Sequence, residues 1–276
     1  MRLQSVPPTA GIAWVRQGWR IFGRQPIAFS ALFAAFLFAI FALTLLPLIG
    51  PLLLLALLPL GSLGFMIGTR EAQQGRVPLP RVFVEPLRRG PRPLRAFVVL
   101  GVVYAVASVA IINLAEWADG GALERLMEVL ADGKATPEDV IARIADPQLA
   151  LGVALRFGLA GLLSIPFWHA PALVHWGAQG AAQSLFSSTL AIWRNKGAFV
   201  AFALAWGALV LAAGAAANLA GTLLGAPQVV AVLAMPASLL LSTVFYASLY
   251  FSFADCFAGS DVHEAAALPP TTESPP

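Results

Sequence analysis

Charged residues are scarce in this sequence of 276 residues: Asp, Glu, Lys and Arg make up only 11%, whereas 59% of the residues are hydrophobic. Soluble domains carry about 25% charged and about 45–50% apolar residues. A chain with so little polar side-chain surface cannot cover a soluble globule. The composition therefore excludes a soluble fold and predicts an integral membrane protein.

Cysteine and catalytic motifs are scarce as well. Cys256 is the only cysteine, so no intramolecular disulfide can form. The sequence contains no P-loop, dinucleotide fingerprint, His-Glu-x-x-His or Gly-x-Ser-x-Gly motif. ATP hydrolysis, Rossmann redox chemistry, zinc proteolysis and serine hydrolysis therefore lose their usual sequence evidence. We predict no catalytic residue, metal ligand or cofactor, and the sequence favours a non-enzymatic role without deciding it.

Long uncharged stretches predict an all-α polytopic bundle of six transmembrane helices. The stretch between Arg24 and Arg70 has no charged residue, and as one helix at about 1.5 Å per residue it would be twice the ~30 Å hydrocarbon core. Two spans must share it, with a turn at Pro47, Gly50 and Pro51. The expected spans are about 27–48, 52–69, 96–115, 157–176, 198–219 and 229–253.

Basic residues alternate with these spans and predict the orientation. Four arginines and no acidic residue precede the first span, and seven arginines lie in residues 70–95. Residues 116–147 instead hold eight acidic and three basic residues. Because Lys and Arg gather in cytoplasmic loops, both termini are predicted to be cytoplasmic in a bacterial inner membrane. Residues 116–147 become an extramembrane outer loop.

One transmembrane domain is expected over residues 1–258. The first apolar run is too long for a cleavable signal peptide. In the outer loop, GALERLMEVLADG has helical apolar spacing and TPED is typical of the start of a second helix. Residues 259–276 are polar and rich in proline, which predicts a disordered cytoplasmic tail.

A short pattern, Arg-x-x-x-Ala-Phe, precedes the first, third and fifth spans. We interpret the chain as three helical hairpins, each introduced by a basic, partly apolar segment. The alternative is chance, since Arg and Phe are common at membrane boundaries. Each hairpin also has a proline in its second helix, which predicts equivalent kinks. The pattern starts at Arg24, Arg92 and Arg194, and the prolines are Pro59, Pro166 and Pro236.

The segment before the first span predicts an interfacial amphipathic helix. Arg16, Arg20 and Arg24 fall on one helical face, and the opposite face is apolar, with Ile12, Val15, Trp19 and Phe22. We expect these arginines, with Arg92 and Arg194, to contact the phosphates of anionic phospholipid. The net charge of +3 does not indicate nucleic acid, because the basic residues lie beside apolar spans. Simple anchoring of the topology is the alternative.

Polar residues inside the spans are the other candidates, because ionisable groups at membrane depth are costly. His169 and His175 lie in PFWHAPALVHW, six residues apart, which is not the i, i+3 or i, i+4 spacing of a metal pair. They could handle protons or substrate, or hydrogen-bond carbonyls that proline frees. Arg156 is expected to snorkel to the interface or to pair across the bundle. The remaining candidates are Asn113, Asn218 and Asp255.

The strings WVRQGWRIFGRQP, PFWHAPALVHWG and STVFYASLYFSFADCF, taken with the six spans, resemble a family of uncharacterised integral membrane proteins of proteobacteria. The resemblance covers nearly the whole chain. The hairpin plan is more loosely similar to YciC-like proteins and to the membrane domain of some glycerophosphodiester phosphodiesterases. These resemblances imply a helical fold and an inner-membrane location, and they transfer no catalytic residue.

Three classes of function are consistent with the sequence. The leading one is a non-enzymatic, transport-related or lipid-interacting membrane component. The second is an intramembrane enzyme that uses His169, His175 and Asp255, which requires these side chains to meet in one cavity. The third is a scaffold that binds a partner protein through the outer loop or the tail.

Overall fold

The computed structural model describes residues 1–131, 136–225 and 227–257, and over these residues its secondary structure is helical, with no strand. Six apolar stretches are long enough to cross a membrane. The predicted all-α transmembrane fold is therefore confirmed. The helices that form these stretches are α2 (Pro26–Thr44), α3 (Ile49–Gln73), α4 (Pro91–Asp119), α7 (Pro147–Phe167) with α8 (Ala170–Gly177), α10 (Lys196–Leu224) and α11 (Pro227–Cys256).

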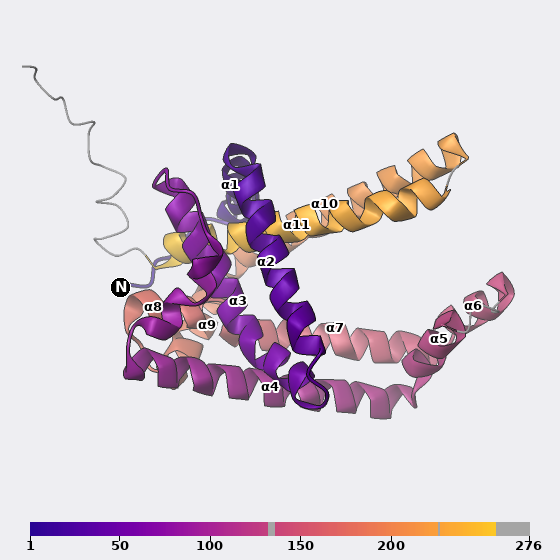
Figure 1. The fold of residues 1–276 in the computed structure, drawn as a ribbon, viewed down its shortest axis with the longest axis horizontal. Helices are drawn as coiled ribbons and strands as arrows, with labels where there is room; N and C mark the ends of the chain where they lie inside the picture. Colours follow the sequence, from indigo (N-terminus) through magenta and orange to yellow (C-terminus); the bar gives the residue numbers. More distant parts are fainter. Residues whose placement is uncertain (132–135, 226, 258–276) are drawn as a thin grey trace, which may run out of the picture.

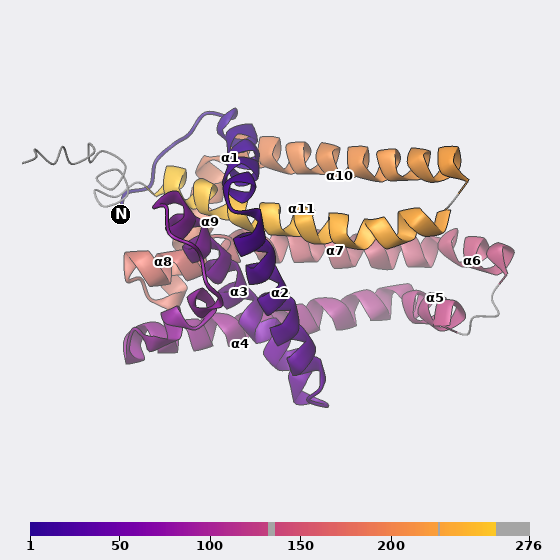
Figure 2. The ribbon, with the colours of Figure 1, turned by 45° about the horizontal axis from the view of Figure 1, so that its top comes forward.

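The long helices pack as the three predicted hairpins, α2 with α3, α4 with α7, and α10 with α11. The α4–α7 and α10–α11 pairs extend in the same general direction, whereas the α2–α3 pair crosses them obliquely (Figures 1 and 2). The prolines are not equivalent, contrary to the prediction. Pro166 precedes the last residue of α7, whereas Pro59 and Pro236 lie well inside α3 and α11.

The fourth span begins earlier than predicted. Helix α7 starts at Pro147 rather than at residue 157, and the Asp146 carboxylate caps it by accepting from the Gln148 backbone N–H at 2.9 Å. Proline is well suited to a first helical turn because it has no N–H to leave unsatisfied. The chain then bends at Trp168 and His169 before α8. The predicted span therefore joined the second half of α7 to α8.

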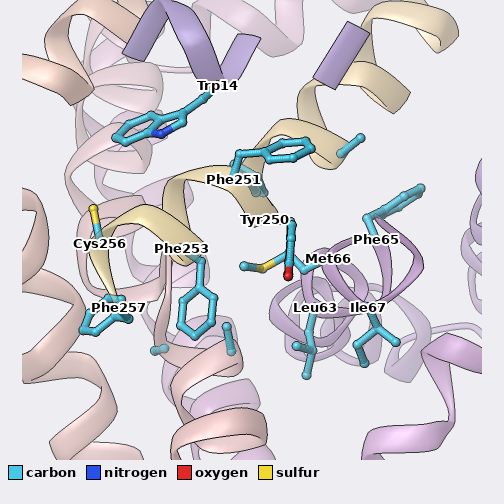
Figure 3. Packing of buried hydrophobic residues seen from close by; sticks show 14 of the residues in the cluster. Trp14, Leu63, Phe65, Met66, Ile67, Tyr250, Phe251, Phe253, Cys256 and Phe257 are labelled. Carbon is cyan, nitrogen blue, oxygen red and sulfur yellow. The ribbon is translucent and has the colours of Figure 1, made fainter. Parts of the chain in front are cut away.

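The core lies mainly at one end of the molecule, which we call the packed end: α1 (Ala10–Arg24), α8, α9 (Ala181–Arg194), the 3-10 turns η1 (Pro80–Phe83) and η2 (Glu85–Arg88), and the adjoining ends of the long helices. Both the N-terminus and the end of α11 are there (Figure 1). Phe65 of α3 stacks on Tyr246 of α11 at 4.9 Å between ring centroids. Figure 3 shows Met66 extending toward the α11 residues Tyr250 and Phe253.

Away from the packed end, the helices expose apolar side chains. Half of the residues in the most apolar stretches of α3 and α11 are buried, against 11–22% in the other four spans. Val106, Phe157 and Leu211 are each more than half exposed on α4, α7 and α10. Extensive apolar exposure of this kind marks a surface made to contact lipid.

The segment predicted as the outer loop contains the two expected helices, α5 (Ala122–Ala131) and α6 (Pro137–Ile144), at the end of the molecule opposite the packed end. Thr136 and Asp139 make a capping box at the start of α6, in which the Asp139 backbone N–H donates to Thr136 Oγ1 at 3.2 Å. The hydrogen bond from the Thr136 hydroxyl holds the pKa of the Asp139 carboxyl below its usual range. The tail predicted for residues 259–276 lies outside the described residues.

Candidate functional site

Helix α1 is fixed to the last turn of α11. The Trp14 indole Nε1 donates to Asp255 Oδ2 at 2.7 Å, and the Trp14 side chain is fully buried. The indole ring also packs on Phe199 and Phe202 of α10, at 5.3 and 6.1 Å between centroids. Figure 3 shows Trp14 above the end of α11. Asp255, a predicted intramembrane candidate, therefore positions α1.

Two glycines bring α1 into backbone contact with the last hairpin. A Cβ at Gly11 would lie 2.1 Å from the Ala198 carbonyl oxygen, and a Cβ at Gly18 would lie 2.9 Å from Ser248 Cβ. Small residues at such crossings allow helix backbones to approach closely. Much of the apolar face of α1, including Val15 and Phe22, is thus buried in protein, while the position of this helix in the membrane interface stays a prediction. The two glycines, two helical turns apart, were the overlooked signal.

Asn195 fixes the N-terminal segment to the same helices. This residue is 2% exposed, at the junction of α9 and α10. Its Oδ1 accepts from the Val6 backbone N–H at 2.8 Å, and its Nδ2 donates to the Gln4 carbonyl at 3.0 Å. Gln4 N–H in turn donates to the Cys256 carbonyl at 2.9 Å. Sequence reasoning missed Asn195, although it lies within the third Arg-x-x-x-Ala-Phe pattern.

These contacts leave the predicted phosphate-binding arginines free of the core. Arg16, Arg20 and Arg24 are exposed on the face of α1 opposite Trp14. Arg92 is exposed in the first turn of α4, and Arg194 is exposed at the end of α9, where its Nη2 lies 3.4 Å from Ser5 Oγ. All five belong to the packed end.

His169 is fully buried in a small polar cluster. Its Nε2 lies 3.1 Å from Ser252 Oγ, which also accepts from Trp168 Nε1 at 3.2 Å and donates to the Leu249 carbonyl at 2.8 Å. A serine hydroxyl has one proton and two lone pairs, and Ser252 donates its proton to Leu249. The hydroxyl therefore accepts its other two hydrogen bonds, one from Trp168 and one from the Nε2–H of His169. The His169 backbone N–H donates to Ser188 Oγ at 3.0 Å.

This arrangement ties the start of α8 to α9 and α11, and it favours the structural alternative for His169. The ring lies among Phe199, Phe253 and Phe257, with centroids 5.4–5.8 Å away. Its Nδ1 has no hydrogen-bond partner among the described residues. The two serines gave no signal in the sequence.

His175 has different neighbours. Its ring packs edge-on against Trp176 at 5.2 Å, and its backbone carbonyl accepts from Arg89 Nη1 at 3.5 Å. The guanidinium of Arg70 lies over the Trp176 ring. His169, His175 and Asp255 thus each have their own partners, which gives an enzyme built on the three no support. In the described part of the chain, no three or more His, Cys, Asp and Glu side chains lie together so that they could bind a metal ion.

The two predicted asparagines face outward. Asn113 Nδ2 donates to the Val109 carbonyl of its own helix at 2.8 Å, and its side chain is exposed. Asn218 is exposed on α10, where its backbone carbonyl accepts from Thr222 Oγ1 at 3.2 Å. The structure therefore separates both residues from the buried cluster.

Arg156 pairs with an acidic residue of another helix. Its guanidinium forms an ion pair and hydrogen bond with the Asp119 carboxylate, which joins the end of α4 to α7. Asp119 is fully buried and also accepts from the Gly121 backbone N–H at 2.8 Å. A Cβ at Gly152 would lie 2.2 Å from Asp119 Oδ2, so only glycine leaves room for this pair. The expectation of pairing across the bundle was right in kind, but its partner is Asp119.

Two cavities lie among the spans. One of about 180 Å³ is at the meeting point of the three hairpins, where Pro59, Tyr104, Trp168 and Tyr246 line it. The other, of about 240 Å³, lies between α2 and α3 beneath η1 and η2, and its lining side chains are apolar.

Comparison with known proteins gives a relative in Burkholderia thailandensis, named as a probable inner membrane protein. The two sequences are 33% identical over an alignment of 276 positions, which covers 99% of this chain and 100% of the relative. The chain belongs to this inner-membrane family. No family model matches the chain, and no solved structure matches it. The match supports the predicted uncharacterised membrane family, whereas the looser likeness to YciC-like proteins and phosphodiesterase membrane domains stays a prediction.

The packed end of this inner-membrane family member exposes several arginine side chains. Guanidinium groups can donate paired hydrogen bonds to phosphate oxygens, and they remain charged at any physiological pH. The histidines, by contrast, are enclosed by aromatic rings and backbone. This end therefore exposes groups that can donate hydrogen bonds to anions.

Proposed function

We propose that the protein is a non-enzymatic, lipid-interacting component of the inner membrane that binds anionic phospholipid through its packed end. The main support is the way α1 is held. The hydrogen bond from Trp14 to Asp255 fixes its buried face, and Arg16, Arg20 and Arg24 are exposed on the other face. In this proposal the packed end and both termini face the cytoplasm.

The rigidity of α1 matters for binding. A free amphipathic helix needs the bilayer to cover its apolar face, but α1 already packs on α10 and α11. Its three arginines are therefore held one turn apart before any lipid arrives, which lowers the ordering cost of binding. Each cation near an anionic leaflet contributes about 1 kcal/mol.

The distribution of charge supports the orientation. The connections at the packed end are rich in arginine, whereas the connection that holds α5 and α6 is acidic. This asymmetry matches the positive-inside rule. We propose that the arginines lie against the cytoplasmic leaflet, whose surface is negative.

A direct test compares lipid binding by matched charge variants. Wild type, R16Q/R20Q and R125Q/R143Q are reconstituted in equal mixtures of phosphatidylglycerol and phosphatidylcholine, extracted in mild detergent, and analysed by native mass spectrometry. We expect phosphatidylglycerol to be enriched on wild type and on R125Q/R143Q, whose changes lie in the outer loop, and the enrichment to fall several-fold in R16Q/R20Q. Equal enrichment in all three proteins would support topology anchoring instead.

A further inference from the structure

The cavity between α2 and α3 is a slot with an entirely apolar lining. It lies between the second half of α2 and the first half of α3 and reaches the 3-10 turns. Its walls include Phe36, Leu43, Leu54, Leu57, Phe83 and Leu87. Because no polar group lines it, a peptide backbone could not satisfy its hydrogen bonds there.

Glycines in α3 shape the inner end of the slot. A Cβ at Gly61 would lie 2.6 Å from the Phe36 ring, and a Cβ at Gly64 would lie 2.1 Å from the Phe83 ring. The two rings stack on each other with centroids 5.9 Å apart. These rings close the slot against the core and leave its length along α2 and α3 unfilled.

The segment above the slot has the composition of a membrane interface. Residues 76–89 contain four arginines and one acid, Glu85, which pairs with Arg89 at 3.1 Å. Arg81 is 68% exposed and lies 3.9 Å from Glu71, and Arg88 is also exposed. Between these cations the same segment exposes the apolar side chains of Val77, Leu79 and Val84. Val84 and Leu87 also line the slot, so cationic and slot-lining residues alternate along one short stretch.

We propose that the slot holds one acyl chain of an anionic phospholipid, with the lipid phosphate on Arg81 and Arg88. This inference rests on the proposed function and adds a defined binding site to it. From Leu54 to Gly61 the slot follows α3 for about 10 Å, at 1.5 Å per residue. That is about two thirds of one leaflet of a ~30 Å hydrocarbon core. A cavity of about 240 Å³ suits part of a single chain.

The test separates this site from general lipid contact. Native mass spectrometry in detergent measures how much added phosphatidylglycerol or phosphatidylcholine, of equal chain length, each variant retains. L57W enlarges an exposed side chain that lines the slot, and L53W is its control, since Leu53 is similarly exposed on α3 but does not line the slot. R88Q removes the head-group contact.

We expect wild type and L53W to retain one phosphatidylglycerol, L57W and R88Q to retain at least fivefold less, and phosphatidylcholine to bind weakly to all. If wild type enriches phosphatidylglycerol but L57W and R88Q retain it fully, the slot assignment is wrong and the proposed function survives. If wild type shows no preference for phosphatidylglycerol, the proposed function itself fails. Should L57W not fold, a chain-length series on wild type decides: the site requires retention to increase with chain length, and a flat series would overturn it.

Discussion

The indole N–H of Trp14 lies 2.7 Å from a carboxylate oxygen of Asp255, so the helix before the first span is bonded to the last turn of the final span. The beginning and the end of the membrane domain are thereby joined. Asn195 strengthens the join, because it holds Gln4 and Val6 while Gln4 also bonds to Cys256. The arginines of α1 belong to a rigid surface for this reason.

Replacing Trp14 by Phe keeps an aromatic ring in the core but removes the donor to Asp255. A hydrogen bond to a charged group contributes about 1.5–3 kcal/mol, and we expect the lower end because the carboxylate is partly solvated. The free energy of unfolding in detergent should fall by about that amount. D255N retains an acceptor oxygen and should lose less. Equal stability of wild type and W14F would show that the bond contributes nothing.

Gly11 provides a steric test of the α1 crossing. In G11A the new methyl group would lie 2.1 Å from the Ala198 carbonyl oxygen, so α1 must shift away from α10. We expect a lower melting temperature and faster trypsin cleavage at Arg16 and Arg20. The matched control is G23A, since a Cβ at Gly23 has no atom within 4 Å. Similar cleavage rates in G11A and G23A would contradict the close crossing.

The fold follows largely from the sequence because membrane spans are set by local composition. The uncharged run between Arg24 and Arg70 is too long for one helix, and its prolines leave one reasonable place for the turn. The start of α7 could also have been predicted from the sequence, because Asp146 and Pro147 are typical of a helix N-terminus. The uncharged apolar run after Arg156 was the stronger pattern and led to a later predicted start.

The candidate site was less predictable because its key contacts join residues far apart in the chain. The alternation of Arg16 and Arg20 with apolar residues predicted an amphipathic α1 correctly. Periodicity does not reveal whether lipid or protein covers the apolar face, and here it is α10 and α11 that cover it. The partners of Trp14 and Arg156, which are Asp255 and Asp119, depend on tertiary packing for the same reason.

The ion pair of Asp119 and Arg156 should stabilise the contact between the end of α4 and α7. R156L leaves the Asp119 carboxylate without its charged partner, which we expect to lower the free energy of unfolding by about 1–3 kcal/mol. D119N also removes the negative charge, so the double variant D119N/R156L should be more stable than R156L alone. A double-mutant cycle of unfolding in detergent gives the coupling. Additive effects would mean that the two side chains do not interact.

The orientation can be tested by chemical labelling. In a C256A background, a cysteine replaces either Met127 in α5 or Gln73 at the end of α3, both of which are exposed. In spheroplasts, a membrane-impermeant maleimide should label M127C directly and label Q73C only after the membrane is permeabilised. The reverse pattern would place the packed end outside and overturn the proposed contact with the cytoplasmic leaflet.

The most direct test of lipid interaction is the phospholipid that accompanies the wild-type protein out of its own membrane. The protein is extracted into polymer-bounded native discs, and its phospholipids are quantified against those of the whole membrane. A lipid-binding packed end predicts a fraction of anionic phospholipid clearly above that of the membrane, and the excess should be lost in R16Q/R20Q. Discs with the same lipid composition as the membrane would contradict the proposal that this family member binds anionic lipid.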